Sequence, residues 1–133
     1  MEKFSYKVKE YGQPTKRYCK SLELKNDEAL IEEYKRLHSQ EKHQKLIRDG
    51  IRSVGILEME IYIHENKLFM IMETPLDFDY EDAMSRLAGL PGQAEWEKLV
   101  DKYQACEPGS ASSEKWQLME RMFFLYEDVE SKD

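Results

Sequence analysis

The chain has 133 residues, of which 41% are hydrophobic, with eight Tyr, five Phe and two Trp, and its formal net charge is −7. This length and composition predict one folded domain with a single core and exclude a disordered chain. The negative charge argues against a nucleic-acid binder, which needs a basic face, and it disfavours acidic substrates and anionic membranes.

The cysteines and the hydropathy of the chain indicate in which cellular compartment the protein is expected. Cys19 and Cys106 lie far apart and form no CxxC motif, so we expect reduced thiols. The longest apolar run, Leu68–Met72, is far too short to span a membrane, and the first residues lack the apolar core of a signal peptide. These features predict a cytoplasmic protein without a membrane segment.

The first half of the chain predicts a strand followed by a helix. Residues 1–16 form an expected N-terminal extension. In Arg17–Lys25, polar and apolar residues alternate with the period of a strand, and Asn26 or Asp27 then supplies a helix N-cap. The segment Glu28–Ser39 is predicted to be helical because apolar residues recur at helical spacing, namely Leu30, Tyr34 and Leu37.

A second helix and a hairpin follow. The helix is expected over Glu41–Asp49, ended by Gly50 or Gly55. The segment Gly55–Thr74 predicts two strands, since apolar and polar residues alternate before a four-residue turn in which Asn66 tolerates a left-handed backbone. We expect these strands to be central, so the acids they carry call for an explanation, either an exposed sheet face or a polar pocket.

The remaining elements are helical until the last strand. Asp79 is expected to cap a short helix that buries Ala83, Met84 and Leu87. The next helix, Gln93–Gln104, is strongly amphipathic, with inward residues expected at Trp96, Leu99, Val100 and Tyr103. A loop over 107–113 precedes a last strand, Trp116–Tyr126, and a charged tail over 127–133.

This element order is typical of an α+β fold. Strand, helix, hairpin, helices and strand match the ferredoxin-like split βαβ arrangement, an antiparallel sheet with helices on one face. The other face would carry both apolar and acidic side chains, from Glu58, Glu60, Tyr62, Phe69, Ile71 and Glu73. Pairing two such faces in a dimer, or closing a small barrel, would create a cavity of ligand size.

Several residues are candidates for chemistry, each with a structural alternative. His38 is a candidate general acid or base because its ordinary pKa is near neutrality, although a lone histidine near a helix end is more often packed or capping. Tyr34, one turn earlier, is able to orient it or to belong to the core. Trp96 offers a face for a sugar ring, but its spacing also fits the core.

Polar residues of the sheet are candidates for sugar binding. Glu58, Glu60 and Tyr62 would line a pocket on the open face, and Arg121 would either pair with these acids or bind ligand. His43 and His64 show no metal-ligand spacing with His38 or a cysteine, so we expect no metal. The sequence contains no phosphate loop or nucleophile motif that would indicate another class of site.

Several blocks of sequence together resemble the L-rhamnose mutarotase family, and most closely its L-fucose mutarotase branch. The resemblance covers about residues 17–126. It is carried by Arg17-Tyr-Cys19, Glu33-Tyr34 with His38, Met59-Glu-Ile-Tyr62, Leu68-Phe-Met-Ile-Met-Glu-Thr74, Glu95-Trp-Glu97, Tyr103-Gln104, Pro108-Gly109, Lys115-Trp116 and Met119-Glu-Arg-Met-Phe123.

The resemblance implies a dimeric α/β-barrel enzyme without a cofactor that interconverts the α and β anomers of a deoxyhexose such as L-fucose or L-rhamnose. It places a catalytic role on His38, a supporting role on Tyr34 and a pocket-lining role on Trp96. Members of the rhamnose type carry a second tryptophan where this chain has Glu97, which favours L-fucose.

The chain departs from the family pattern at one place. A Trp-Pro-Glu segment of the family falls on Gln44, Lys45 and Leu46, so its tryptophan and its acid are absent, and the interval from His38 is about two residues longer. Glu41 and His43 are near enough to substitute. The departure keeps open a non-catalytic sugar-binding or regulatory module on the same scaffold, and fold analogy alone allows a cofactor-free enzyme of another chemistry.

Overall fold

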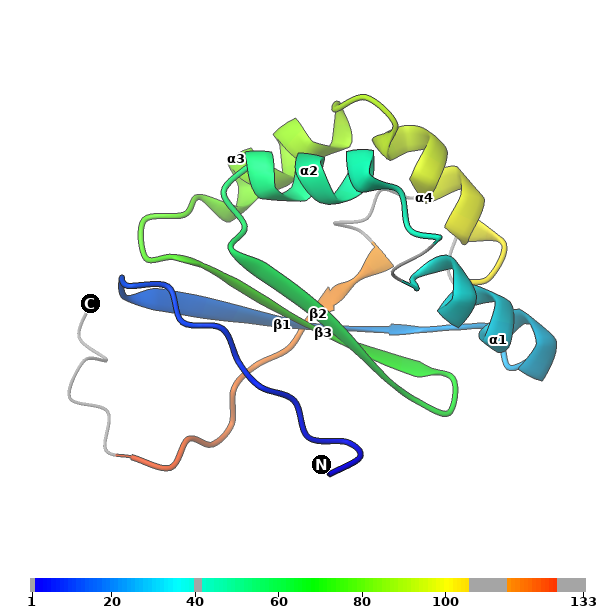
Figure 1. The fold of residues 1–133 in the computed structure, drawn as a ribbon, viewed down its shortest axis with the longest axis horizontal. Helices are drawn as coiled ribbons and strands as arrows, with labels where there is room; N and C mark the ends of the chain where they lie inside the picture. The colour runs from blue at the N-terminus through cyan, green and yellow to red at the C-terminus, as the bar shows by residue number, and fades with distance from the viewer. Residues whose placement is uncertain (1, 40–41, 106–114, 127–133) are drawn as a thin grey trace.

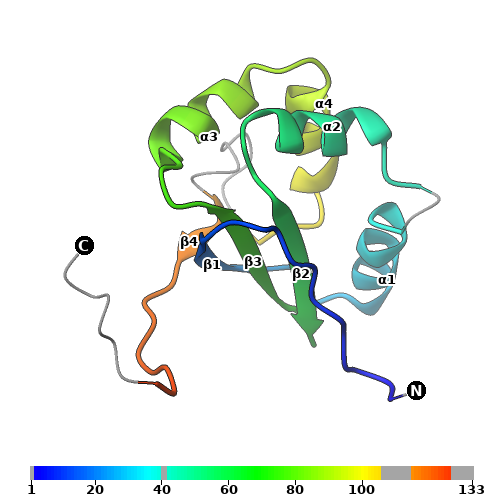
Figure 2. The same ribbon diagram turned by 60° about the vertical axis from the view of Figure 1, so that its left-hand side comes forward.

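The computed structural model describes residues 2–39, 42–105 and 115–126. Its elements in chain order are β1 (Thr15–Glu23), α1 (Glu28–Leu37), α2 (Lys45–Ser53), β2 (Glu58–His64), β3 (Lys67–Pro75), α3 (Tyr80–Ala88), α4 (Gln93–Asp101) and β4 (Gln117–Leu118). The four strands form one antiparallel sheet, and Figures 1 and 2 show α2, α3 and α4 covering one side of it. The predicted α+β architecture is therefore confirmed.

The strand order β2-β3-β1-β4 places the acidic strand at an edge. The expectation that Glu58 and Glu60 lie on a central strand is wrong, because β2 pairs only with β3. Charged side chains are common on edge strands, where they discourage pairing with other chains. The acids on β2 therefore do not by themselves require a ligand.

The face of the sheet under the helices is the core. Leu22, Leu24, Leu68, Met70 and Met72 are all buried there, as strand alternation predicts. Side chains from the helices complete the core, namely Tyr34, Ile47, Ala83, Met84, Leu87 and Val100. The predicted inward position of Leu99 is wrong, since this side chain is 40% exposed, because α4 turns it away from the sheet.

The two helix N-caps form as predicted, but the hairpin turn uses a different residue in the left-handed conformation. Asp27 accepts a hydrogen bond from the Leu30 amide at 3.1 Å, and Asp79 accepts one from the Asp82 amide at 3.1 Å, so both predicted caps are confirmed. In the hairpin turn the left-handed residue is Glu65, with φ of 57°, and not Asn66. The Asn66 side chain instead donates to the Leu24 carbonyl at 3.0 Å, which ties the turn to the end of β1.

Helix α2 begins and ends later than the pattern predicts. Gly50 lies inside it, and Gly55, with φ of 104°, follows its end. A Cβ at Gly50 would lie 3.3 Å from Leu90 Cδ1, so this glycine allows close packing against the loop after α3. Glu41, where this helix was expected to begin, lies outside the described residues.

The predicted last strand is much shorter than expected. Only Gln117 and Leu118 pair with β1, and the Met119 amide makes the last bond, to the Cys19 carbonyl at 2.8 Å. Beyond it, residues 120–126 are exposed and form no strand, because no neighbouring strand among the described residues offers them a row of hydrogen bonds. The predicted loop 107–113, Cys106 and the tail 127–133 lie outside the described residues.

Candidate active site

A cavity of about 500 Å³ lies between α2, the end of α1 and the edge strand β2. This volume is within the range of small-molecule sites. Its polar lining comes from side chains of four segments, namely Lys9, His38, Ser39, His43, Arg48, Arg52 and Glu58. Its apolar lining comes from α2, β2 and the residues between them, namely Ile51, Ile56, Leu57, Met59 and Ile61.

His38 lies at the C-terminal end of α1, where the helix presents its imidazole to this cavity. Its Nδ1 lies 2.9 Å from the Tyr34 carbonyl oxygen. Because a carbonyl only accepts, Nδ1 carries the proton, and the neutral ring keeps Nε2 as a free lone pair. Burial lowers the pKa of His38, and the bond to Tyr34 opposes this only in part. His38 is therefore a neutral base at neutral pH.

His43 forms an aromatic cluster with His38 and Trp96. Its ring centroid lies 5.5 Å from that of His38 and 4.7 Å from that of Trp96, and Trp96 also packs edge-on against His38 at 5.1 Å. Burial is the main cause that lowers the pKa of His43, and the charges of His38 and Arg48 lower it further. Two titratable imidazoles with lowered pKa values thus share one cavity wall.

Tyr34 acts behind the cavity wall. Its side chain is 4% exposed, and its ring packs on His38 with centroids 4.4 Å apart. The Gln104 amide donates to the Tyr34 hydroxyl at 3.4 Å, which anchors the ring to the residues after α4. Through its ring and its carbonyl, Tyr34 fixes the orientation of His38.

Only one of the sheet residues expected to line the pocket does so. Glu58 lines the cavity. Glu60 and Tyr62 lie outside it, where the Tyr62 ring meets Tyr6 of the N-terminal segment with centroids 5.7 Å apart. Arg121 also lies outside it, and its guanidinium stacks 4.0 Å from the centroid of the Phe124 ring.

The sequence indicates His43 only as a possible substitute for the absent acid, and it gives no sign of the cations at this cavity. The described residues contain no cluster that fits a metal. The longer interval after His38 was the available signal, because it places a second histidine where the family pattern has none. Lys9, Arg48 and Arg52 left no such signal, since each lies in a stretch of ordinary solvent-exposed composition.

The comparison with family models decides the family. The model of the L-rhamnose mutarotase family matches residues 17–125, which is most of the chain. The chain belongs to this family. As a member it is an isomerase acting on carbohydrates, a sugar mutarotase of the rhamnose or fucose type.

Individual relatives agree with this assignment. An L-fucose mutarotase of Xanthomonas campestris pv. campestris is 36% identical over 113 residues, which cover 85% of this chain and 90% of that protein. A Dictyostelium discoideum protein whose name states no activity is 33% identical over 114 residues, covering 83% of this mutarotase and 90% of that protein.

No helix among the described residues of this mutarotase is long and apolar enough to cross a membrane.

A solved structure supports the fold. The L-rhamnose mutarotase of Formosa agariphila has a TM-score of 0.62 with 18% identity, and the match covers 84% of this mutarotase and 99% of that chain. At this identity the likeness concerns the fold alone, and it agrees with a four-stranded antiparallel sheet covered by helices.

Proposed function

We propose that this mutarotase interconverts the α and β anomers of a deoxyhexose, L-fucose or its relative L-rhamnose, by acid–base catalysis without a cofactor. The observation that carries the proposal is His38, whose Nδ1–H is held by the Tyr34 carbonyl at 2.9 Å while Nε2 remains available at the cavity. The activity that names the Xanthomonas relative, and Glu97 in place of a second tryptophan, favour L-fucose over L-rhamnose.

Mutarotation needs two proton transfers at neighbouring oxygens. His38 Nε2 removes the proton of the anomeric hydroxyl, and a second group protonates the ring oxygen as the C1–O5 bond breaks. The open-chain aldehyde then recloses on either face of C1. Because the reaction is its own reverse, each group serves as acid in one direction and as base in the other.

His43 is the proposed second group. It compensates for the absent acid of the Trp-Pro-Glu segment, since its ring lies 5.5 Å from that of His38 and lines the same cavity. Trp96 packs behind both imidazoles and restricts their rotation. Glu58 is the proposed acceptor for sugar hydroxyls. Glu60, Tyr62 and Arg121 do not line this cavity, so they would contact a ligand only if it were bound at the open face of the sheet.

A homodimer in the cytoplasm is part of this proposal. Large apolar side chains stay exposed on the helix-free face and in the C-terminal segment, among them Tyr62, Phe69, Met122 and Phe123, the last being 71% exposed. A second copy of the chain would cover such a surface. Light scattering at micromolar concentration should give twice the mass of one chain, and a strictly monomeric mass would refute the dimer.

The test of function is anomer exchange followed by saturation-transfer NMR. We expect protein to accelerate exchange of L-fucose and of L-rhamnose over buffer, with L-fucose the faster. No acceleration of either sugar would refute the proposal. A sugar-binding module without catalysis is not favoured, because the cavity keeps His38 and adds His43; sugar binding in calorimetry with no exchange would revive it.

A further inference from the structure

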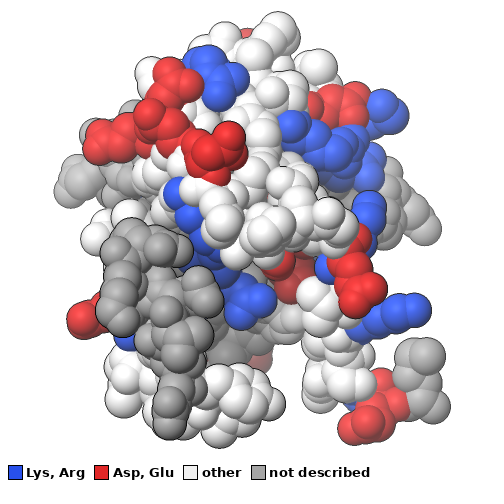
Figure 3. Space-filling view, turned by 90° about the vertical axis from the view of Figure 1, so that its left-hand side faces the viewer, with Lys and Arg blue, Asp and Glu red and all other residues white. Residues whose placement is uncertain are grey.

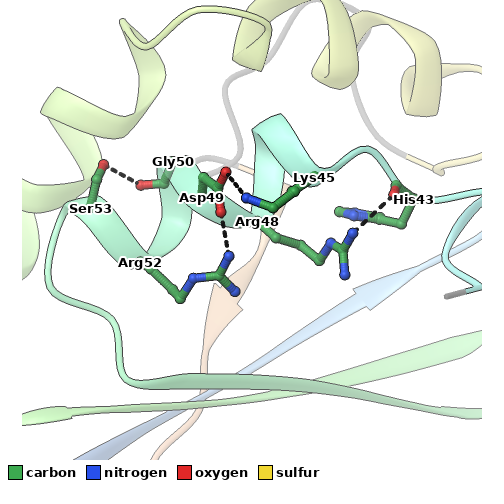
Figure 4. Close-up of polar contacts among 7 residues, drawn as sticks. All are labelled: His43, Lys45, Arg48, Asp49, Gly50, Arg52 and Ser53. Carbon is green, nitrogen blue, oxygen red and sulfur yellow. Dashed lines mark hydrogen bonds and ion pairs between the residues drawn. The ribbon is translucent and has the colours of Figure 1, made fainter.

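The cavity wall carries a group of cations that a neutral deoxyhexose does not require. Lys9 of the N-terminal segment and Arg48 and Arg52 of α2 all line it. Figure 4 shows both guanidinium groups on the same side of α2, together with the His43 ring. In the space-filling view of Figure 3, basic side chains gather at the upper right, next to acidic ones.

Arg48 has donors that the described protein does not satisfy. Its Nε is buried without a hydrogen-bond partner, and its Nη2 reaches only the His43 carbonyl at 3.5 Å, at the limit of a hydrogen bond. No carboxylate of the described residues forms an ion pair with it, whereas Arg52 pairs with Asp49 and Arg86 of α3 pairs with Asp82. A buried Nε–H without an acceptor is costly unless a ligand supplies one.

The residues that line the cavity carry more positive than negative charge. Lys9, Arg48 and Arg52 line it, with Glu58 as the one carboxylate among the described lining residues, and of these cations Arg52 is paired with Asp49. The net charge of −7 does not oppose this, because charges further apart than the Debye length of about 8 Å are largely screened at physiological ionic strength. The expectation that an acidic chain avoids acidic substrates thus overlooks the local arrangement.

We infer that this cavity binds an aldose that carries an anionic group, a carboxylate or a phosphate, with the anion at Arg48 and the anomeric carbon at the two histidines. The inference deepens the proposed function, since it names the substrate class of the same cavity. The planar guanidinium offers Nε–H and Nη–H as a fork for two oxygens of the anion. Lys9 and Arg52 add charge from the flanking walls, and the contact of Arg48 with the His43 backbone sets the anion beside the reacting end.

Calorimetry on the full chain tests the binding preference without relying on turnover. L-galacturonate and L-fucose have the same ring configuration and differ in a carboxylate against a methyl group. We expect L-galacturonate to bind about tenfold or more tightly than L-fucose, and L-galactose 6-phosphate then distinguishes the source of the anion. Whichever anionic sugar binds more tightly identifies the group; if neither exceeds L-fucose, the inference is overturned.

Matched variants locate the anion. Arg48→Gln should reduce the preference for the anionic sugar over L-fucose by about 10- to 100-fold, whereas Arg86→Gln, the same change on α3 outside the cavity, should leave it intact. Lys9→Gln should reduce it by a smaller factor than Arg48→Gln, with Lys7→Gln as its control. Equal preferences in the Arg48 and Arg86 variants would overturn the assignment even if both proteins fold normally.

The two proposals fail separately. Anomer exchange is measured by NMR on the same sugars. Tight binding of L-galacturonate with no accelerated exchange of any sugar would refute the proposed function and leave the anion site standing. Accelerated exchange of L-fucose with no preference for an anionic sugar would do the reverse.

Discussion

Replacing His38 by asparagine separates the chemistry of the imidazole from its structural role. The asparagine amide nitrogen falls near the position of His38 Nδ1, so it is able to keep the hydrogen bond to the Tyr34 carbonyl, which is 2.9 Å long in this mutarotase. The variant has no counterpart of Nε2, the nitrogen that is the proposed base. The substitution therefore removes the proposed base while keeping the local helix end.

The expected loss of rate is large and the expected loss of stability small. A positioned general base contributes about 10²–10⁴-fold, which corresponds to about 3–5 kcal/mol of barrier. The preserved hydrogen bond limits the structural cost to the lost ring packing against Trp96 and His43, about 1 kcal/mol in the free energy of unfolding.

Two measurements check this separation. Saturation-transfer NMR on L-fucose gives the anomer exchange rate, and urea denaturation gives the free energy of unfolding. His64→Asn is the matched control, because His64 is an exposed residue at the end of β2 and does not line the cavity. Its exchange rate and stability should both match those of the parent protein.

The reasoning is refuted by a folded His38→Asn variant that keeps most of the acceleration. It is also refuted if the rate falls only in proportion to a loss of folded protein. In either case Nε2 of His38 is not the base, and His43 would become the group to test first.

Three further predictions follow from the same geometry. Because burial lowers the pKa of His38 and of His43 below 6.5, the exchange rate should pass through a maximum below neutrality, since it rises with pH as His38 loses its proton and falls as His43 loses the proton that it donates; a rate still climbing above pH 8 contradicts this. The stability that the neutral rings contribute should be complete above pH 6.5 and be lost as pH falls through their folded-state pKa values. His43→Ala should slow exchange by about 10- to 100-fold while Gln44→Ala, an exposed neighbour, does not, and equal rates in the two variants would remove His43 from the mechanism. Leu24→Ala, at a side chain 1% exposed, should cost about 2–5 kcal/mol of unfolding free energy, against less than about 0.5 kcal/mol for Leu76→Ala at 56% exposure, and similar costs in denaturation would show that the core is not where the sheet places it.

Local chemistry explains what was predictable about the fold. Alternation along β1 and β2, the aspartate caps before α1 and α3, and the short hairpin turn depend on residues a few positions apart, so the sequence determines them. The sequence misplaces helix α2 because a glycine is typical of a helix end, whereas Gly50 lies inside this helix and its missing side chain allows the close approach of Leu90. The last strand was overextended because apolar residues after Leu118 resemble a strand, although pairing requires a partner.

The candidate site shows the same division. By itself the sequence determined the family blocks, the element order and the choice of His38 and Tyr34, since an i, i+4 pair on a helix is local. Only the tertiary structure decided which residues share a cavity: it joined His43 to His38 and Trp96, brought Arg48 beside His43, and placed Glu58 but not Glu60 at the cavity. The physical reason is that a site is made of side chains from different elements, and their distances depend on how the helices pack on the sheet rather than on any spacing along the chain.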